Sequence, residues 1–354
     1  MSYKQMATAA TVVVVAVVVY ALFFSSLVVS EYRSEATNAV QKLLPPPILD
    51  TVDYDRRLLE LAHVALSTTT SPNAQVASST GRLWPVKAVY PNVGALLPFK
   101  RIVAYYGNFY AKGMGVLGEY PTDQMLGMLR AEAQRWEEAD PTTPVIPAIH
   151  YIAVVAQYAA GKEGRYILRM PDDQIDHALD VARQVNGIVF LDVQVGKSTV
   201  ERELPMLEKY LKMPQVHLAI DPEFSMKYGD RPGTVIGTLD AVDVNFATQY
   251  LAKLVRENSL PPKVLVVHRF TQKMVTNYKQ IHPLPEVQIV MDMDGFGSKE
   301  KKKGTYSRVI YPEPVQFTGI KLFYKNDIKP PSTGMLTTSE VLKLTPAPIY
   351  IQYQ

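Results

Sequence analysis

The sequence predicts a barrel of eight parallel β-strands with helices between them, a (β/α)8 barrel of the triosephosphate isomerase type. From residue 99 to the C-terminus, eight short apolar runs alternate with segments of helical periodicity. These units occupy about 255 residues, the usual length of such a barrel. A doubly wound open sheet is the alternative, but the glycine-containing segment 107–118 after the first strand is too unspecific to favour it.

The N-terminal segment predicts a membrane-spanning helix ahead of the barrel. Residues 6–30 contain no charged side chain, and about 20 helical residues suffice to cross the hydrocarbon of a bilayer. A cleaved signal peptide has a shorter apolar region of about 7–15 residues, so an uncleaved anchor is favoured over cleavage. Lys4 precedes the segment, which places the N-terminus in the cytoplasm and the barrel outside the cytoplasm.

Between the anchor (1–30) and the barrel (99–354), residues 31–98 predict a stalk. Leu58, Leu59, Ala62 and Leu66 recur at helical spacing and indicate one short amphipathic helix. Small polar residues follow at 67–81, a composition typical of linkers.

Composition excludes several classes of protein. The 354 residues carry 37 Lys and Arg against 34 Asp and Glu, and a net charge of +3 gives no indication of a nucleic-acid partner. The chain has no cysteine, so disulfides, thiolate zinc sites and iron–sulfur clusters are excluded.

The predicted strands and helices follow from runs and capping residues. Helices are expected to begin at Thr122, Asp172 and Asp240, and capping boxes are expected at Ser198 with Glu201 and at Thr337 with Glu340. The lysine-rich run 299–303 predicts a solvated helix face. The predicted strands are 101–107, 145–155, 187–196, 216–224, 263–270, 287–295, 319–324 and 348–354.

Polar and aromatic side chains follow the apolar part of nearly every predicted strand. Residues two apart share one side of a strand, so inward-facing members would converge on the C-terminal rim, where barrel enzymes place their sites. Glu119, in the loop after the first strand, could reach over the same mouth. The strand residues are Tyr105, Tyr106, His150, Asp192, Gln194, Asp221, Glu223, His268, Asp292, Asp294, Lys321 and either Tyr350 or Gln352.

Clustered carboxylates at one rim favour glycoside hydrolysis. This reaction needs one protonated carboxylic acid and a second carboxylate, and like-charge repulsion holds one of them protonated near neutral pH. The expected catalytic residues are Glu223, Asp221, Asp192 and Asp292. The expected binders of a polysaccharide or glycan, without a cofactor, are Tyr105, Tyr106, Glu119, His150, Gln194, His268, Asp294, Lys321 and Tyr350.

Two resemblances accompany these patterns. The run "IDPEF" resembles the D-x-E ending of the fourth strand in chitinases and barrel-fold lysozymes, which implies Glu223 as general acid and Asp221 as its partner. The ordered motifs "GVLGE", "FLDVQVG", "LAIDPEF", "VVHRF", "MDMDGFG", "GIKLFY" and "YIQYQ" resemble a family of exported bacterial barrel proteins without an established activity. That resemblance implies the barrel fold and export to the cell envelope.

Two other classes of function remain open. A hydrolase could bind a divalent metal through the mixed His and carboxylate set, although no H-x-H on the first strand and no H-E-x-x-H is present. A non-catalytic envelope protein could use the same mouth to bind a glycan or a partner. The candidate metal ligands are His150, Asp192, Asp221, Glu223, His268 and Asp292.

Overall fold

The computed structural model describes residues 48–65 and 82–354. The predicted spanning segment 6–30 and the parts of the predicted stalk at 31–47 and 66–81 lie outside the described residues. Within the described ranges, no helix combines the length and the apolar character needed to cross a membrane. The membrane anchor therefore stays a prediction.

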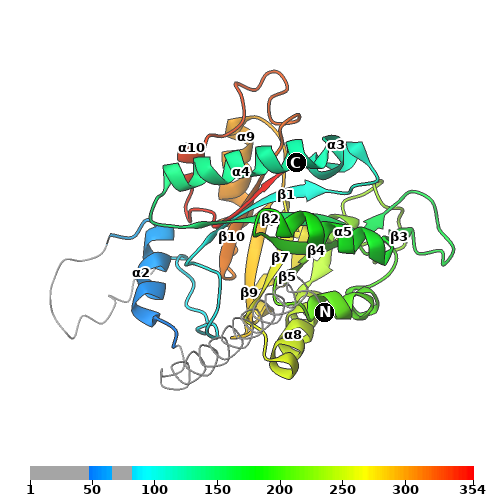
Figure 1. The fold of residues 1–354 in the computed structure, drawn as a ribbon, viewed down its shortest axis with the longest axis horizontal. Helices are drawn as coiled ribbons and strands as arrows, with labels where there is room; N and C mark the ends of the chain where they lie inside the picture. Colours follow the sequence, from blue (N-terminus) through cyan, green and yellow to red (C-terminus); the bar gives the residue numbers. More distant parts are fainter. Residues whose placement is uncertain (1–47, 66–81) are drawn as a thin grey trace, which may run out of the picture. The chain divides into compact units, whose positions relative to one another are not determined.

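Eight parallel strands close into a barrel, which confirms the predicted fold class (Figure 1). The neighbours run in the order β1, β2, β4, β5, β7, β9, β10 and β11, and β11 pairs with β1 in parallel to close the ring. The strands are β1 (Arg101–Gly107), β2 (Val145–Ala156), β4 (Ile188–Val193), β5 (Val216–Ile220), β7 (Lys263–Arg269), β9 (Val287–Met293), β10 (Phe317–Leu322) and β11 (Tyr350–Tyr353).

Strand β2 is longer than its neighbours and extends past the barrel. Its register with β4 shifts between Ile152 and Val154, and its last residues pair antiparallel with β3 (Ile167–Arg169). A second small sheet pairs β6 (Leu239–Asp240) with β8 (Val275–Thr276). The loop that joins β2 to β3 therefore lies beyond the C-terminal end of the barrel strands.

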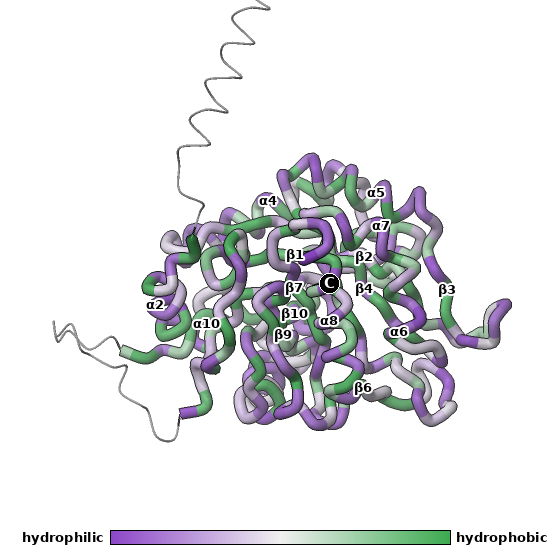
Figure 2. The backbone as a smooth tube through the Cα atoms, turned by 90° about the horizontal axis from the view of Figure 1, so that it is seen from below, coloured by the Kyte–Doolittle hydropathy of each residue, from purple (hydrophilic) through white to green (hydrophobic). Residues whose placement is uncertain are grey.

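Helices surround the strands, and their apolar faces pack on the barrel (Figure 1). Figure 2 shows hydrophobic and hydrophilic residues alternating along α4 and α5. The helices are α2 (Thr51–Leu61), α3 (Val116–Glu119), α4 (Thr122–Ala139), α5 (Asp172–Arg183), α6 (Val200–Glu203), α7 (Glu208–Leu211), α8 (Ala241–Asn258), α9 (Lys299–Thr305) and α10 (Thr338–Leu342). The short turns are η1 (Lys112–Met114), η2 (Leu204–Leu207), η3 (Pro222–Phe224), η4 (Gln272–Met274), η5 (Tyr278–Gln280) and the π-helical η6 (Tyr306–Ile310).

The predicted helix starts are mostly confirmed. Helices α4 and α5 begin at Thr122 and Asp172, and capping boxes are present at Asp240 and Thr337. The prediction of a capping box at Ser198 is wrong. Thr199 caps α6 instead, because the Ser198 hydroxyl donates to the Glu203 carboxylate.

The strand pleat divides the core into two apolar clusters. The larger cluster lies between the strands and the surrounding helices. The smaller one fills the barrel interior with alternate strand residues, as the two-residue period requires. Its strand members are Ile102, Ala104, Ala148, Ile188, Phe190, Ala219, Val264, Val266, Val290, Phe317 and Tyr350.

Parts of the predicted stalk pack against the barrel. Tyr54 of α2 and the fully buried Leu97 belong to the interior cluster. The backbone of Leu97 both donates to and accepts from the side-chain amide of Gln288 on β9. The compact unit that contains the barrel accordingly begins at Leu49.

Candidate functional site

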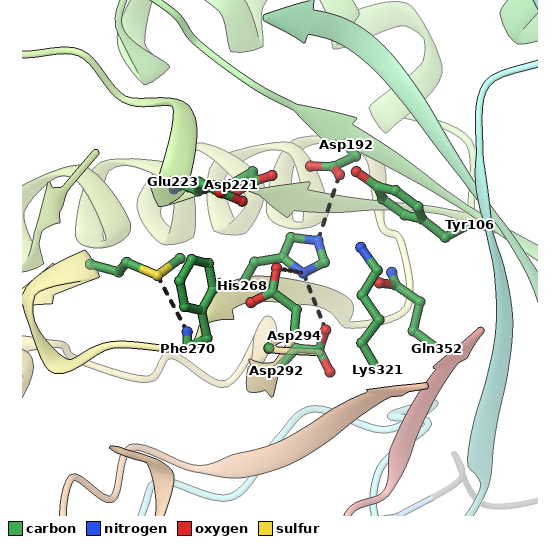
Figure 3. Close-up of polar contacts among 12 residues, drawn as sticks. Tyr106, Asp192, Asp221, Glu223, His268, Phe270, Asp292, Asp294, Lys321 and Gln352 are labelled. Atoms are coloured by element: carbon green, nitrogen blue, oxygen red, sulfur yellow. Dashed lines mark hydrogen bonds and ion pairs between the residues drawn. The ribbon is translucent and has the colours of Figure 1, made fainter. Parts of the chain in front are cut away.

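Polar side chains on the barrel strands, or directly after them, meet inside the C-terminal end of the barrel, and Figure 3 shows most of them. Register explains part of this convergence, because Tyr106 lies beside His150, and His268 beside Asp292, on neighbouring strands. We call this set the mouth cluster. Its members are Tyr106, His150, Asp192, Gln194, Asp221, Glu223, His268, Asp292, Asp294, Lys321, Tyr350 and Gln352.

Within the mouth cluster, His150, Asp192 and His268 form a histidine–aspartate group. All three side chains are fully buried. Asp192 Oδ2 lies 3.4 Å from Nε2 of His150 and 3.6 Å from Nε2 of His268. Neither contact is a hydrogen bond, so both carboxylate oxygens and both Nε2 atoms are buried without a partner. Buried polar atoms without a partner are uncommon in native proteins and require a specific explanation.

The other ring nitrogen of each histidine has a partner. His150 Nδ1 lies 2.6 Å from the Tyr350 hydroxyl, and His268 Nδ1 lies 3.1 Å from Asp292 Oδ2. A carboxylate only accepts hydrogen bonds, so Nδ1 of His268 carries a proton and donates it to Asp292. Two of the residues predicted to bind substrate are therefore held by Tyr350 and Asp292 from the next layer of side chains.

The two histidines differ in proton affinity. Burial lowers the pKa of His150 to about 4, although the nearby Asp192 opposes this. Burial also works against a charge on His268, but the nearby Asp192 carboxylate and the hydrogen bond to Asp292 outweigh it and hold the pKa of His268 well above its usual value. Burial works against the charged form of Asp192, but the contacts with both histidines favour that form more strongly. The pKa of Asp192 is therefore lowered. These opposite shifts favour the neutral form of His150 and the charged form of His268.

Asp221, Glu223 and Asp294 form a second cluster, the carboxylate group, in which one oxygen from each lies within 4.8 Å of the others. Asp221 follows β5 and accepts the Glu223 backbone N–H at 3.1 Å, which fixes the turn η3. Gln194, directly after β4, donates to the other oxygen of Asp221 at 3.4 Å. Glu223 is partly exposed, whereas Asp221 and Asp294 are buried.

Burial, together with the charges of neighbouring carboxylates, raises the pKa of every member of the carboxylate group. Burial raises the pKa of Asp221 well above its ordinary value, and the charges of Asp192, Asp294 and Glu223 add to this effect. Burial and Asp294 raise the pKa of Glu223. Burial, Asp292 and Asp192 raise the pKa of Asp294. At least one carboxylic acid is thus kept protonated above the pH at which free carboxyls ionise.

Removing the Asp221 carboxylate should stabilise the metal-free protein at neutral pH. A carboxyl group with a raised folded-state pKa takes up protons on folding, so its unfavourable effect appears above the unfolded-state pKa and grows with pH. We expect Asp221→Asn to raise the free energy of unfolding by about 0.5–2 kcal/mol at pH 7, with little gain near pH 3. Chemical denaturation in chelator at both pH values measures this, and an equal effect at both would contradict it.

Gly319 leaves room for the side chains of the mouth cluster, and the sequence analysis did not identify this role. It pairs with Asp292 across β9 and β10, and a Cβ at this position would lie 2.6 Å from Asp292 Oδ1 and 2.9 Å from Tyr350 Cδ1. A glycine inside an otherwise apolar strand, two residues before Lys321, is the sequence signal for such a close approach. Lys321 Nζ lies 3.5 Å from the centre of the Tyr106 ring, a cation–π contact.

Two predicted site residues do not join the mouth cluster. Tyr105 points to the helix layer, where its hydroxyl bonds that of Tyr324 and Tyr324 in turn donates to Glu132 of α4. Tyr105 and Tyr106 are adjacent on β1, so the pleat sends them to opposite faces. Glu119 of α3 forms an ion pair with Lys325 at 2.5 Å. The remaining predicted site residues belong to the cluster.

The prediction of a solvated face for residues 299–303 is wrong at Lys302. Its side chain is buried, and Nζ donates to the backbone oxygens of Gly295 and Lys321 at 2.9 and 2.6 Å. The same nitrogen pairs with the buried Asp327 at 3.0 Å. Lys302 therefore joins the segments that follow β9 and β10 just beneath the mouth.

Comparison with known proteins gives fold likeness only. No protein-family model matches the chain, and no curated protein is similar to it. Similar solved structures include a ruminal GH26 endo-β-1,4-mannanase, with 10% identity over 72% of this chain and 59% of that chain and a TM-score of 0.34. The cellulose synthase subunit Z of Clostridioides difficile has 10% identity over 72% and 91% of the two chains, with a TM-score of 0.39. The Bacillus subtilis mannanase BCman has 13% identity over 63% and 74%, with a TM-score of 0.32.

The class of protein thus rests on the chain itself. Its own strand pairing defines a closed parallel (β/α)8 barrel, and its buried titratable groups lie at the C-terminal end, where barrel enzymes place their sites. The chain spans 59% of the length of the ruminal mannanase. Membership of the exported bacterial family stays a prediction.

Proposed function

We propose that the barrel mouth hydrolyses glycosidic bonds. The observation that carries this proposal is the carboxylate group, in which Asp221, Glu223 and Asp294 approach one another within 4.8 Å from the ends of two strands. Glycosidases place two carboxyl groups about 5–5.5 Å apart when they retain configuration and about 6.5–9.5 Å apart when they invert it. Oxygens within 4.8 Å of one another agree better with the retaining arrangement than with the inverting one, so retention is part of the proposal.

Glu223 and Asp294 fit the two catalytic roles. Glu223 is the partly exposed member, and its raised pKa suits a general acid that protonates the leaving oxygen. Asp294 has an oxygen within 4.8 Å of the Glu223 oxygen, and in its ionised form it would attack the anomeric carbon. Asp221 is tied to the Glu223 backbone and to Gln194, so it positions the acid. Asp192 and Asp292, both expected to be catalytic, lie beside the histidines: Asp192 Oδ2 is 3.4 Å from His150 Nε2, and Asp292 accepts from His268 Nδ1.

Exposed aromatic rings on the loops beyond the strands favour a carbohydrate substrate. Tyr110, Tyr158, Tyr228 and Phe296 are exposed and follow β1, β2, β5 and β9. Flat aromatic faces stack on sugar rings. Arg231, from the loop after β5, donates to the Tyr158 hydroxyl at 2.9 Å, so two of these loops contact each other.

We further propose that the enzyme works outside the cytoplasm, held by residues 6–30 in the bilayer. The uncharged length of this segment and Lys4 before it support the proposal. Cell-envelope or environmental polysaccharide would then be the substrate. Protease protection of the barrel in intact and permeabilised cells tests the orientation.

The test of activity is product release from glycans. Full-length protein in detergent is incubated with peptidoglycan and a panel of soluble polysaccharides, and new reducing ends are measured. We expect release by the wild type and a loss of about 10²–10⁴-fold in kcat for Glu223→Gln, because the substitution removes the transferable proton.

Glu119→Gln is the matched control, since Glu119 pairs with Lys325 and lies outside the mouth cluster. It should retain wild-type rates. Equal release by wild type and Glu223→Gln would refute the role of Glu223. If the wild type binds a glycan and releases nothing, the chain is a binding protein and the proposal of hydrolysis fails.

A further inference from the structure

We propose that His150, Asp192 and His268 bind one divalent transition-metal ion inside the barrel mouth. The three residues come from β2, β4 and β7, and each offers a ligand atom within 4.8 Å of the others. Two imidazole nitrogens and one carboxylate oxygen form a donor set typical of zinc and of non-haem iron. The proposal stands apart from glycoside hydrolysis, because metal binding is measured without any substrate.

The spacing of the donor atoms matches tetrahedral coordination. Two donors bound at about 2.1 Å to one tetrahedral ion lie about 3.4 Å apart. Asp192 Oδ2 lies 3.4 Å from His150 Nε2 and 3.6 Å from His268 Nε2. These separations are too long for good hydrogen bonds and agree with ligands that share an ion.

The same donor atoms are buried and lack partners. His150 Nε2, His268 Nε2 and both oxygens of Asp192 make no hydrogen bond, although their side chains are fully buried. Because Nδ1 of His268 donates to Asp292, Nε2 of the neutral ring presents its lone pair toward the Asp192 carboxylate. The lone pairs of His268 Nε2 and the Asp192 oxygen repel each other unless a cation lies between them. A metal ion and a proton are the two candidates.

The surrounding side chains resemble the outer shell of a metal site. Metal-bound histidines commonly donate their second nitrogen to a carboxylate or another oxygen, as His268 does to Asp292. The Tyr350 hydroxyl, which also accepts from Gln352, can accept the Nδ1 proton of His150. Both rings are thus oriented with Nε2 toward Asp192.

Charge favours a dication over a single proton. The mouth cluster contains five carboxyl groups but only one lysine, Lys321. Three protein ligands would leave a fourth position on the ion, an arrangement found in catalytic rather than structural zinc sites. Figure 3 shows Tyr106 beside Asp192. The five carboxyl groups are Asp192, Asp221, Glu223, Asp292 and Asp294.

The test is direct measurement of metal. Full-length protein in detergent is stripped with chelator, titrated with zinc chloride, desalted and analysed by elemental mass spectrometry. We expect one equivalent of zinc in the wild type and less than about a tenth of an equivalent in His268→Gln and Asp192→Asn. Asp292→Asn keeps all three ligands and should weaken zinc binding about 10–100-fold.

His217→Gln is the matched control. His217 is also buried inside the barrel, but it lies at the N-terminal end of β5, away from the mouth cluster. Its Nδ1 accepts the Val264 backbone N–H there. This variant should retain one equivalent. If the ligand variants fail to fold, cobalt(II) added to the wild type decides: strong visible bands of four-coordinate cobalt support the site. Zinc retained equally by His268→Gln, no bound zinc, or only the weak spectrum of six-coordinate cobalt would overturn it.

Discussion

Replacing Lys302 by methionine should destabilise the barrel by about 3–5 kcal/mol, the usual cost of removing one partner of a buried ion pair. Lys302 and Asp327 are both almost completely buried, and the Lys302 ammonium also donates to the backbone oxygens of Gly295 and Lys321. Methionine retains much of the apolar volume but leaves the charge of Asp327 and two carbonyl groups unpaired. Urea denaturation followed by circular dichroism measures the loss.

Two further variants isolate the buried charge. Lys303→Met removes a neighbouring, exposed lysine whose ion pair with Glu340 is 3.2 Å long, and it should cost less than about 1 kcal/mol. The double variant Lys302→Met with Asp327→Asn should recover part of the loss, because no unpaired charge remains. A double variant less stable than Lys302→Met would contradict this account.

Trp136→Ala should cost a similar amount, about 3–5 kcal/mol, and should loosen the closure of the barrel. Trp136 is fully buried on α4, and its indole N–H donates to the Tyr353 hydroxyl on β11 at 3.0 Å. The Arg101 guanidinium of β1 lies 5.4 Å from the centre of the same ring. The side chain therefore covers the seam between the first and last strands. The midpoint of urea denaturation reports the loss, and faster amide exchange in β1 and β11 reports the opening.

Trp136→Phe and Glu138→Ala are the controls. Phenylalanine keeps most of the apolar contact but cannot form the hydrogen bond. Trp136→Phe should therefore lower the free energy of unfolding by about 0.5–1.5 kcal/mol, the contribution of one hydrogen bond, plus a smaller packing loss. Glu138 is exposed on the same helix and should be nearly neutral. A Trp136→Ala protein as stable as Glu138→Ala would show that the seam does not depend on this side chain.

The eight strands and the end of the barrel that holds the site could be predicted from the sequence because both depend on local pattern. Apolar runs of strand length carried polar residues at one end, and a two-residue period sends alternating side chains inward. Asp192, Gln194, Asp292 and Asp294 followed directly from this rule. The prediction that both Tyr105 and Tyr106 belong to the site did not follow this rule, because adjacent residues on a strand face opposite sides.

Other features of the site could not be predicted because they depend on contacts between residues far apart in the sequence. The run 299–303 has no feature that distinguishes Lys302 from the other lysines, since its burial depends on Asp327 in the segment after β10. The division of the mouth into a histidine–aspartate group and a carboxylate group was likewise hidden. It arises from the order of strands around the barrel and from the second nitrogen of each histidine, which Tyr350 and Asp292 engage.

Position 319 also has an evolutionary consequence. Where most inward positions of the barrel supply a side chain, Gly319 supplies the room that Asp292 and Tyr350 occupy. In homologous chains that keep an aspartate at 292, we expect glycine to recur at 319, and the two positions to change together when the mouth acquires another chemistry. This pair of residues would then serve as a diagnostic signature, readable from an alignment, of barrels that retain the same buried constellation.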